Sequence, residues 1–187
     1  MNRRTSLIGL GLLALGGSAS VLVPASRAAK APTRSLDDIR NNWRQFVGRR
    51  ADIAQNKDRI AKTDEQWRKL LGEPAYDVLR HEGTERPFTS PLNDEHRAGV
   101  FVCAGCALPL FTSEMKFDSG TGWPSFFTSI PEVFATTTDT KLIYPRTEYH
   151  CVKCEGHHGH VFDDGPKPTG QRWCNNGVAL RFIPLAV

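Results

Sequence analysis

The sequence predicts a single, mainly β domain that is preceded by short helices and stabilised by a metal ion. Beyond Gly83 the chain consists of short alternating or aromatic-rich runs separated by Gly, Pro and Asp, a pattern typical of antiparallel strands joined by turns. Two Cys-x-x-Cys pairs lie in this region. With 187 residues the chain is long enough for one domain with a real core plus short extensions, and we expect no second full domain.

Helices are expected before the strands. Thr63-Asp64-Glu65-Gln66 is a capping-box pattern that predicts a helix start, and Glu73-Pro74 predicts a second start because proline is favoured in a first turn. Upstream, apolar residues recur at helical spacing across Leu36–Arg50, which predicts one further helix. We place it in a linker and helical extension, residues 29–62, that leads into the main domain at residues 63–187.

Strands are expected in the rest of the chain. Alternation and turn residues predict them at Gly99–Cys103, Lys141–Tyr144, Glu148–Val152, Gly159–Phe162 and Gly177–Ile183. Cys174 then lies at the start of the final strand.

The first 28 residues have the pattern of an export signal. They combine basic Arg3-Arg4, an apolar run from Leu7 to Val23 and small residues that end at Ala28, after which we expect cleavage. Paired arginines before a weakly hydrophobic run are typical of twin-arginine signals. We therefore expect a periplasmic or otherwise exported protein. The alternative is an uncleaved membrane anchor, although the run is short for a span of about 20 apolar residues.

The net charge gives no sign of a nucleic-acid partner. The full chain carries +4, but residues 1–28 contain three arginines and no acid, so the processed chain falls to +1. Four thiolates around one zinc ion would add a further charge of about −2. The basicity therefore belongs to the export signal, and we expect no nucleic-acid binding.

Four of the five cysteines form two pairs, Cys103 with Cys106 and Cys151 with Cys154. Each pair places two sulfurs on one tight turn, so together they predict a closed, structural zinc site that joins two distant hairpins. Disulfides are the alternative in an exported protein. The odd cysteine count and the poor geometry of Cys-x-x-Cys pairs for a stable disulfide framework favour the metal.

Residues beside the cysteine pairs allow two further expectations. Gly105 and Gly156 are expected to permit the tight backbone turns. His150, next to Cys151, is an alternative ligand, although a surface or core histidine is the simpler interpretation.

Cys174 is the thiol left for chemistry. Free cysteines are commonly small buried core residues, and that interpretation stays open. A reactive thiolate needs nearby positive charge or hydrogen-bond donors, and Arg172, Asn176 and the histidines between Gly156 and His160 can supply them by lowering the pKa of the thiol.

The histidine run has a geometric requirement. In a regular strand His158 and His160 share a face and His157 points away, so His157 and His160 converge only if the chain bends at Gly159. A surface or adventitious metal-binding tract is the alternative.

An aromatic loop completes the motifs. Gly120 and Gly122, just before Trp123, place its ring on a sharply turned loop, where it can form an apolar wall for a small group. The alternative is a core tryptophan in a hairpin.

Together these clusters resemble one family, the type B methionine sulfoxide reductases, from about Thr63 to Pro184. The resemblance runs through Thr84-Glu85-Arg86-Pro87-Phe88, Asp118-Ser119-Gly120, Gly122-Trp123-Pro124-Ser125-Phe126, His157, Gly159-His160-Val161-Phe162, Asp164-Gly165-Pro166, Pro168-Thr169-Gly170, Arg172, Cys174 and Asn176. It implies two antiparallel sheets with N-terminal helices and a structural zinc site, and an enzyme that reduces methionine-(R)-sulfoxide in proteins.

The resemblance also implies roles for individual residues. Cys174 would attack the sulfoxide sulfur and become a sulfenic acid, and His157 and His160 would supply or relay the proton that the departing oxygen needs. The other assignments are substrate methyl binding by Trp123 together with Phe162, and positioning of polar groups and charge by Asn176 and Arg172.

This chain departs from the family pattern in an informative way. Many members have a second cysteine where Thr121 stands, and that thiol resolves the sulfenic acid as a disulfide. Its absence predicts a one-cysteine cycle in which an external thiol or a thioredoxin-like donor reduces Cys174 directly. His158 stands where leucine is common and places a polar residue beside the expected site. Smaller departures are Trp173, where tyrosine or phenylalanine is common, and Gly177, where serine is common.

Two other functions remain open on the sequence. A zinc-stabilised module that binds ligands or proteins without catalysis would need the cysteine pairs and the aromatic loop but not Cys174. A general thiol peroxidase or disulfide exchanger would need Cys174 but not Trp123. For the reductase we expect proteins containing methionine sulfoxide and a thiol reductant as partners, and a monomeric chain.

Overall fold

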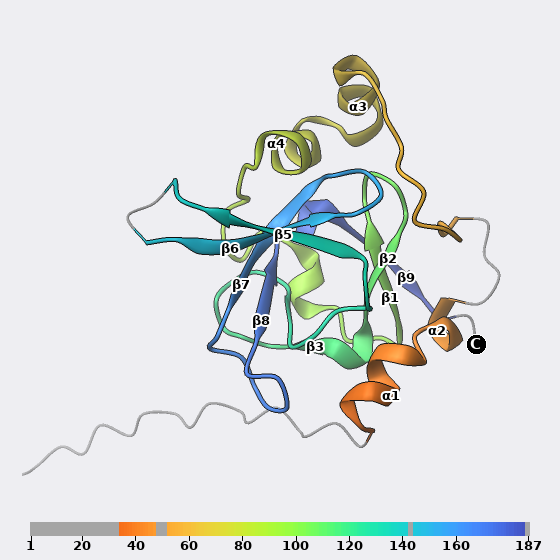
Figure 1. The fold of residues 1–187 in the computed structure, drawn as a ribbon, viewed down its shortest axis with the longest axis vertical. Helices are drawn as coiled ribbons and strands as arrows, with labels where there is room; N and C mark the ends of the chain where they lie inside the picture. Colours follow the sequence, from red (N-terminus) through yellow and green to blue (C-terminus); the bar gives the residue numbers. More distant parts are fainter. Residues whose placement is uncertain (1–33, 48–51, 142–143, 186–187) are drawn as a thin grey trace, which may run out of the picture.

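The computed structural model describes residues 34–47, 52–141 and 144–185 and confirms a mainly β fold with two antiparallel sheets (Figure 1). The smaller sheet has the order β2-β1-β9, made of β1 (Gly99–Cys103), β2 (Pro109–Thr112) and β9 (Leu180–Pro184). The larger sheet has the order β3-β4-β8-β7-β6-β5. Its strands are β3 (Lys116–Phe117), β4 (Ser125–Phe126), β5 (Phe134–Asp139), β6 (Arg146–Cys151), β7 (His157–Phe162) and β8 (Arg172–Asn175).

The main core is aromatic and receives side chains from both sheets. Phe101 of β1, Phe111 of β2 and Phe126 of β4 are fully buried in one cluster with Tyr149 of β6. The rings of Phe111 and Phe126 stack with centroids 3.9 Å apart. Burial of such rings supplies most of the free energy that holds the two sheets together.

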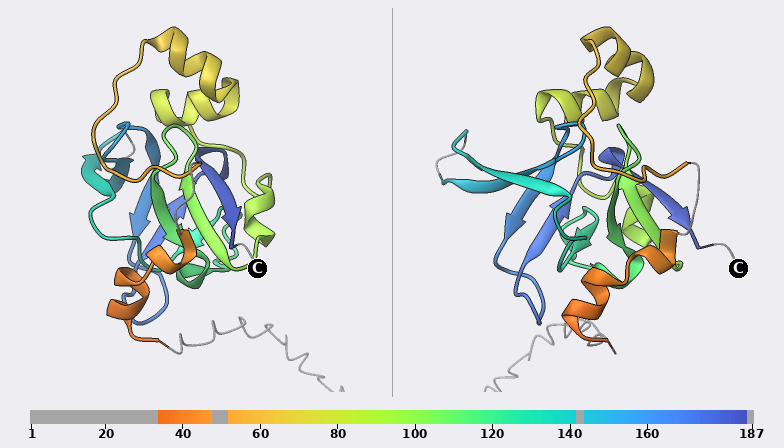
Figure 2. Two further views of the ribbon diagram at one scale, coloured as in Figure 1. Left: turned by 90° about the vertical axis from the view of Figure 1, so that its right-hand side faces the viewer. Right: turned by 45° about the vertical axis from the view of Figure 1, so that its right-hand side comes forward.

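Helices α3 (Asp64–Leu71) and α4 (Glu73–His81) lie on one end of this core (Figures 1 and 2). The predicted capping box is present, because Thr63 Oγ1 accepts from Gln66 N and Gln66 Oε1 accepts from Thr63 N. Proline occupies the first turn of α4, as expected. Three short 3₁₀ helices complete the elements: η1 (Pro91–Asp94), η2 (Ser113–Met115) and η3 (Gly177–Ala179).

The prediction of a single helix over Leu36–Arg50 is wrong for the residues of this range that the structure describes. The segment forms two short helices, α1 (Leu36–Asn41) and α2 (Arg44–Val47), while residues 48–50 lie outside the described part. The break lets Phe46 and Val47 turn onto the outer face of the small sheet, where they bury Val100, Val102 and Ile183.

The strand expectations were partly right. Gly99–Cys103 matches β1, and Glu148–Cys151 and Gly159–Phe162 lie within β6 and β7. The strand expected at Lys141–Tyr144 is wrong, because Lys141 and Tyr144 belong to the turn between β5 and β6, and Tyr144 is 78% exposed. The final run is also divided, since η3 precedes β9, and Cys174 lies earlier than expected, inside β8.

The predicted export signal, residues 1–28, lies outside the described part of the chain. Among the helices that are described, none has the length and apolar character needed to cross a bilayer.

Candidate active site

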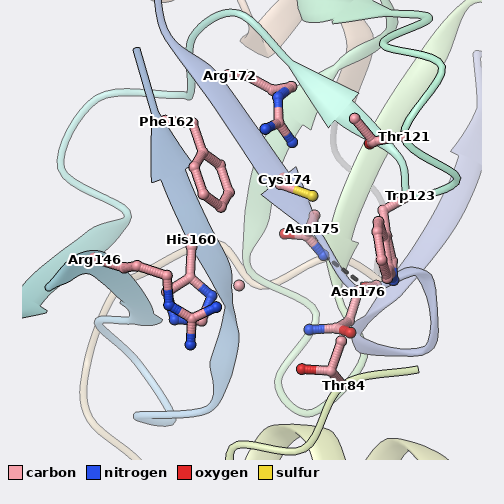
Figure 3. Close-up of a pocket in the computed structure, with 11 residues that line it drawn as sticks. Thr84, Thr121, Trp123, Arg146, His160, Phe162, Arg172, Cys174, Asn175 and Asn176 are labelled. Atoms are coloured by element: carbon pink, nitrogen blue, oxygen red, sulfur yellow. Dashed lines mark hydrogen bonds between the residues drawn. The ribbon is translucent and has the colours of Figure 1, made fainter. Parts of the chain in front are cut away.

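The pairing of β7 with β8 places Cys174 directly beside His160. Gly159 pairs with Asn175, His160 with Cys174 and Phe162 with Arg172. Side chains at directly opposed positions point to the same face and lie about 5 Å apart at Cβ. The thiol, the imidazole, the Phe162 ring and the guanidinium are therefore neighbours on one face of the large sheet (Figure 3).

These side chains border a cavity of about 230 Å³. Of the residues predicted for the site, six line it: Cys174, His160, Asn176, Trp123, Phe162 and Arg172. Figure 3 shows Trp123 and Thr121 on one side of the Cys174 sulfur and Phe162 with His160 on the other. A mostly apolar cavity with one thiol and a few polar groups is suited to a small substrate side chain such as that of oxidised methionine.

The Trp123 ring is held in place by the loop that precedes η1. Trp123 Nε1 donates to Glu85 O at 3.1 Å, and Phe88 N donates to Gly122 O at 2.7 Å. Gly122 has a φ of 92°, and a Cβ there would lie 2.8 Å from Phe88 N. Only glycine fits between the two loops, so Gly122 fixes the direction in which Trp123 projects.

His157 does not line the cavity, but it lies behind His160. The ring centroids of the two residues are 5.5 Å apart. The sequence required a bend at Gly159, and the structure has the irregularity one residue earlier. The pairing of β6 with β7 shifts register, so that Tyr149 faces Gly159 and His150 faces His157, with His158 as the extra residue. This bulge brings His157 and His160 to one face of the sheet.

His158 lies on the opposite face, so the expectation that it sits beside the site is wrong. Its ring is fully buried in the core and stacks on Tyr149 at 6.3 Å. Burial lowers the pKa of His158 to about 4, so it stays neutral. A histidine at position 158, where leucine is common in the family pattern, therefore lies in the core and not at the cavity.

Asp139 and Arg146 extend the site from His160 toward the β5–β6 hairpin. Nε2 of His160 lies 2.9 Å from Oδ2 of Asp139, which also accepts from Arg146 at 2.5 Å. Hydrogen bonds from the Lys141 backbone and from His160 hold the pKa of Asp139 well below its usual range. An ionised carboxylate only accepts, so His160 donates through Nε2, and Nδ1 is the nitrogen that can gain or lose a proton.

The resting charge state of the reacting pair differs from the sequence-based expectation. Burial raises the pKa of the Cys174 thiol, and this effect exceeds the opposing influence of Arg172 and of a hydrogen bond with Thr121. Burial likewise lowers the pKa of His160, although Asp139 opposes it. Cys174 is therefore a neutral thiol beside a neutral imidazole at neutral pH, and not a preformed thiolate.

Arg172 is fixed by two partners. Its Nε and Nη2 donate to the two oxygens of Asp164 at 2.8 and 2.9 Å, and its guanidinium lies 4.3 Å from the centre of the Phe162 ring. This bidentate pair and the stacking hold a positive charge near Cys174.

Asn176 connects the site to two other segments. Its Nδ2 donates to His158 O at 3.1 Å, and its Oδ1 accepts from Glu85 N at 3.0 Å. Both ends of the amide are therefore engaged within the protein, and Asn176 fixes the position of β7 relative to the loop that carries Thr84.

Glu85 is a site residue to which the sequence interpretation gave no role. Its backbone O holds Trp123, its backbone N holds Asn176, and its carboxylate accepts from Gly177 N and Val178 N at 2.5 and 3.0 Å. The residue lies within the Thr84–Phe88 motif, so the motif marked its importance but not its contacts. Thr84, Arg146 and Asp139 were likewise not singled out.

The four paired cysteines form one cluster at the ends of β1 and β6. Their sulfurs all lie within 4.8 Å of one another, and Cys103–Cys154 and Cys106–Cys151 sulfurs are 3.5 Å apart. A tetrahedral zinc ion with bonds of about 2.3 Å needs sulfur–sulfur separations of about 3.8 Å. The separations fit such an ion and exceed a disulfide bond, and all five cysteines are free thiols.

The two Cys-x-x-Cys turns have the same backbone conformation and the same hydrogen bond. Ala107 N donates to Cys103 O and Glu155 N donates to Cys151 O, each at 2.8 Å. Ala107 and Glu155 take the left-handed conformation, at φ values of 59° and 61°. The expectation that Gly105 and Gly156 provide this freedom is therefore wrong.

Neighbouring residues complete the surroundings of the cluster. Gly156 is needed for space, because a Cβ there would lie 2.7 Å from Leu79. His150 faces Glu148 at 3.4 Å, on the strand surface that carries His157.

Comparisons with known proteins agree with this geometry. A family model described as the SelR domain matches residues 71–184. Proteins named peptide methionine sulfoxide reductase MsrB are similar to this chain: that of Hahella chejuensis is 52% identical over 126 residues, which cover 67% of this chain and 91% of that protein. The one from Leifsonia xyli is 50% identical, covering 71% and 97%, and the one from Methanosarcina mazei is 47% identical, covering 70% and 92%. The chain belongs to the SelR domain family of type B peptide methionine sulfoxide reductases.

Proposed function

We propose that this protein reduces methionine-(R)-sulfoxide residues of proteins to methionine, with Cys174 as the nucleophile. The observation that carries the proposal is the convergence of Cys174, His160 and Trp123 on one cavity in a member of this family. A non-catalytic recognition module would have no use for a thiol paired with a histidine and a carboxylate.

The reaction needs one proton in the right place, and the resting site already holds it. Transfer of the Cys174 proton to His160 yields a thiolate and an imidazolium without any exchange with solvent, and Asp139 stabilises the imidazolium. The thiolate attacks the sulfoxide sulfur and forms an S–S bond, while His160 protonates the oxygen. The S–S bond and the S–O bond of the substrate then break as the hydroxyl moves to the Cys174 sulfur. The products are methionine and the Cys174 sulfenic acid, so two electrons move from the thiol to the substrate.

Epimer selectivity follows from three fixed contacts. Trp123 and Phe162 supply apolar walls for the methyl group, and His160, which lines the same cavity, would receive the oxygen. Once the positions of methyl group and oxygen are set, only one hand of the sulfoxide presents its sulfur to Cys174.

The second half of the cycle uses an external reductant. In the part of the chain that the structure describes, the other four cysteines are committed to the sulfur cluster, and a hydroxyl of Thr121 takes the resolving position. An incoming thiol attacks the sulfenic sulfur, water leaves, and a second thiol releases Cys174 as a disulfide of the donor forms.

An assay with separated epimers tests the proposal. The R epimer of a peptide methionine sulfoxide should be reduced in the presence of a dithiol, the S epimer should not, and Cys174→Ser should abolish turnover. Peroxide reduction that does not depend on Trp123 would favour a general thiol peroxidase. Turnover of neither epimer by the folded, zinc-loaded protein would favour the recognition module.

We further propose that the sulfur cluster holds one structural zinc ion and that the enzyme acts, as a monomer, outside the cytosol. Support for zinc is the fit of the sulfur separations, and support for export is the pattern of residues 1–28. Lysine substitution of Arg3 and Arg4 should retain the protein in the cytosol, as measured by cell fractionation.

A further inference from the structure

The sheet face that carries His157 holds a second group of metal-ligating side chains. Glu148 and His150 lie on β6, and His157 on β7 pairs directly with His150. One donor atom from each of the three residues lies within 4.8 Å of the other two. Oε1 of Glu148 is 2.5 Å from Nδ1 of His157 and 3.4 Å from Nε2 of His150.

The polar atoms of His157 are not satisfied by the protein. The side chain is only 1% exposed, yet neither ring nitrogen makes a hydrogen bond, and the close approach to Glu148 does not have hydrogen-bond geometry. Buried polar groups are almost always paired, so a buried imidazole in this condition calls for a further ligand. Burial lowers the pKa of His157 to about 3, which leaves the neutral form that binds metal ions.

The charges around the group favour a cation. Two nearby basic side chains are paired with other acids, Arg59 with Glu155 and Lys141 with Glu82. The Glu148 carboxylate is buried against two imidazoles. A buried carboxylate is costly unless an opposite charge meets it.

Space for an incoming ion lies next to the group. Glu148 and His150 line a cavity of about 580 Å³ on the outer face of β5 and β6. Glu82 and Glu155 also line this cavity, each paired with its own basic side chain. Water in this cavity can complete the coordination of an ion that has three protein ligands.

We propose that Glu148, His150 and His157 form a binding site for a second divalent transition-metal ion, such as zinc, nickel or cobalt. Two imidazoles and one carboxylate are a common donor set for these ions. Tetrahedral coordination with bonds of about 2.1 Å needs donor separations of about 3.4 Å. The 3.4 Å between Glu148 and His150 matches that value, and the 2.5 Å between Glu148 and His157 is shorter. This site is distinct from the sulfur cluster, because its donors are nitrogen and oxygen.

Occupancy would control the reductase, and this consequence depends on the proposed function. An ion bound to His157 places positive charge behind His160, whose ring lies 5.5 Å from that of His157, and this charge opposes protonation of His160 by Cys174. Loss of general acid–base assistance lowers rates by about 100-fold. The ion would therefore act as a reversible inhibitor.

Cobalt binding tests the site without reference to activity. Full-length Cys174→Ser protein with its sulfur cluster loaded with zinc is titrated with Co²⁺, so that neither the reactive thiol nor the cluster can bind it. We expect one additional equivalent with visible d–d absorption and without a thiolate-to-cobalt charge-transfer band. His150→Gln should abolish that absorption, and His96→Gln, a change at an exposed histidine, should preserve it. Equal cobalt binding by the His150→Gln protein, or none by the parent, would overturn the proposal.

Activity provides the second readout. Ni²⁺ should inhibit R-epimer reduction by the wild-type protein, a chelator added at once should restore it, and the His150→Gln variant should resist. His150→Gln should match wild type without added metal, and zinc analysis should show an intact sulfur cluster. Cobalt binding with no inhibition would refute the control of catalysis, whereas a protein that binds cobalt but reduces neither epimer would refute only the proposed function.

Discussion

Glu85 shows how one side chain can determine the shape of the site without entering the cavity. Its backbone holds the Trp123 indole and the Asn176 amide, and its carboxylate accepts two backbone N–H groups at the start of η3. Hydrogen bonds to a charged acceptor each contribute about 1.5–3 kcal/mol. The residue therefore positions the aromatic wall relative to Cys174.

Glu85→Gln replaces one accepting oxygen by a donor and leaves a backbone N–H facing it. We expect a loss of about 2 kcal/mol in the free energy of unfolding, measured by urea denaturation, and at least a roughly tenfold fall in kcat/KM. Glu132→Gln, which removes only a surface ion pair with Lys57, should leave both quantities unchanged. Unchanged kcat/KM in the Glu85 variant would mean that this residue does not position the cavity.

The Cys174–His160 pair predicts a specific pH profile. Activity needs one proton shared by the pair, and this state exists between the two pKa values. The pKa of His160 lies below the 6.5 usual for histidine, because of burial, and the pKa of Cys174 lies above the usual 9.0 for the same reason. The profile of kcat/KM should fall in acid only below 6.5 and in alkali only above 9.0.

Removal of the Asp139 charge shifts one limb of that profile. Asp139 raises the pKa of His160, so Asp139→Asn should lower it further and move the acid limb to lower pH, together with a fall in kcat of about tenfold or more. A shift of the acid limb toward higher pH would contradict the assigned electrostatics.

Individual residues of the site were predictable where a motif fixed them. Cys174 followed from cysteine counting, and Trp123 from the two glycines that precede it, Gly120 and Gly122. The pKa of Cys174 was not predictable, because residues adjacent in sequence reveal charge but not burial. The contacts of Glu85 with Gly177 and of Asp139 with His160 could not be predicted either, because these partners are distant in the sequence.

At the scale of elements, the bulge in the β6–β7 pair places His157 and His160 on the same face of the sheet. Without the extra residue, His157 and His160 would lie on opposite faces of the sheet. Gly159 permits this arrangement, because a Cβ there would lie 2.0 Å from Cys174 O. The backbone of β8 can approach β7 this closely only opposite a glycine.

Gly159→Ala should push β8 away from β7 and thereby increase the distance between Cys174 and His160. Overpacking of this kind costs about 1–3 kcal/mol, and we expect a lower Tm by calorimetry together with little remaining R-epimer reduction. Gly120→Ala provides the matched control, since Gly120 also has positive φ but has open space around it. Equal effects of the two substitutions would show that strain in φ, and not the close approach, matters.

Strands and helices differed in how far the sequence predicted them. The helix starts at Thr63 and Glu73 were right because capping is local chemistry. Strand β5 was missed, because four of its six residues are exposed and it lacks apolar alternation. The break between α1 and α2 was also missed, since it depends on packing against β1 and β9.

At the scale of the whole molecule, the sulfur cluster joins the two sheets. Cys103 ends β1 of the small sheet and Cys106 follows in the next turn, whereas Cys151 ends β6 of the large sheet and Cys154 follows in its turn. Helix α4 covers the cluster, where Arg80 donates to Cys154 O at 2.7 Å. The proposed zinc ion would stabilise the contact between the two sheets, which also positions the active site.

Zinc removal should therefore unfold much of the protein. Structural zinc sites supply on the order of 10 kcal/mol of binding free energy, so a strong chelator or Cys154→Ser should abolish the cooperative thermal transition. Cys174→Ser should keep one zinc and melt like wild type. A chelated protein with unchanged Tm would refute a structural role for the metal.

The one-cysteine cycle is the central claim, and mass spectrometry after a single turnover tests it most directly. Zinc-loaded protein is mixed with R-epimer substrate without reductant, treated with a sulfenic-acid trap and digested. We predict the trap on Cys174 alone and free thiols at Cys103, Cys106, Cys151 and Cys154, whereas Thr121→Cys should give a 121–174 disulfide. A wild-type disulfide between Cys174 and any of those four cysteines would contradict the account.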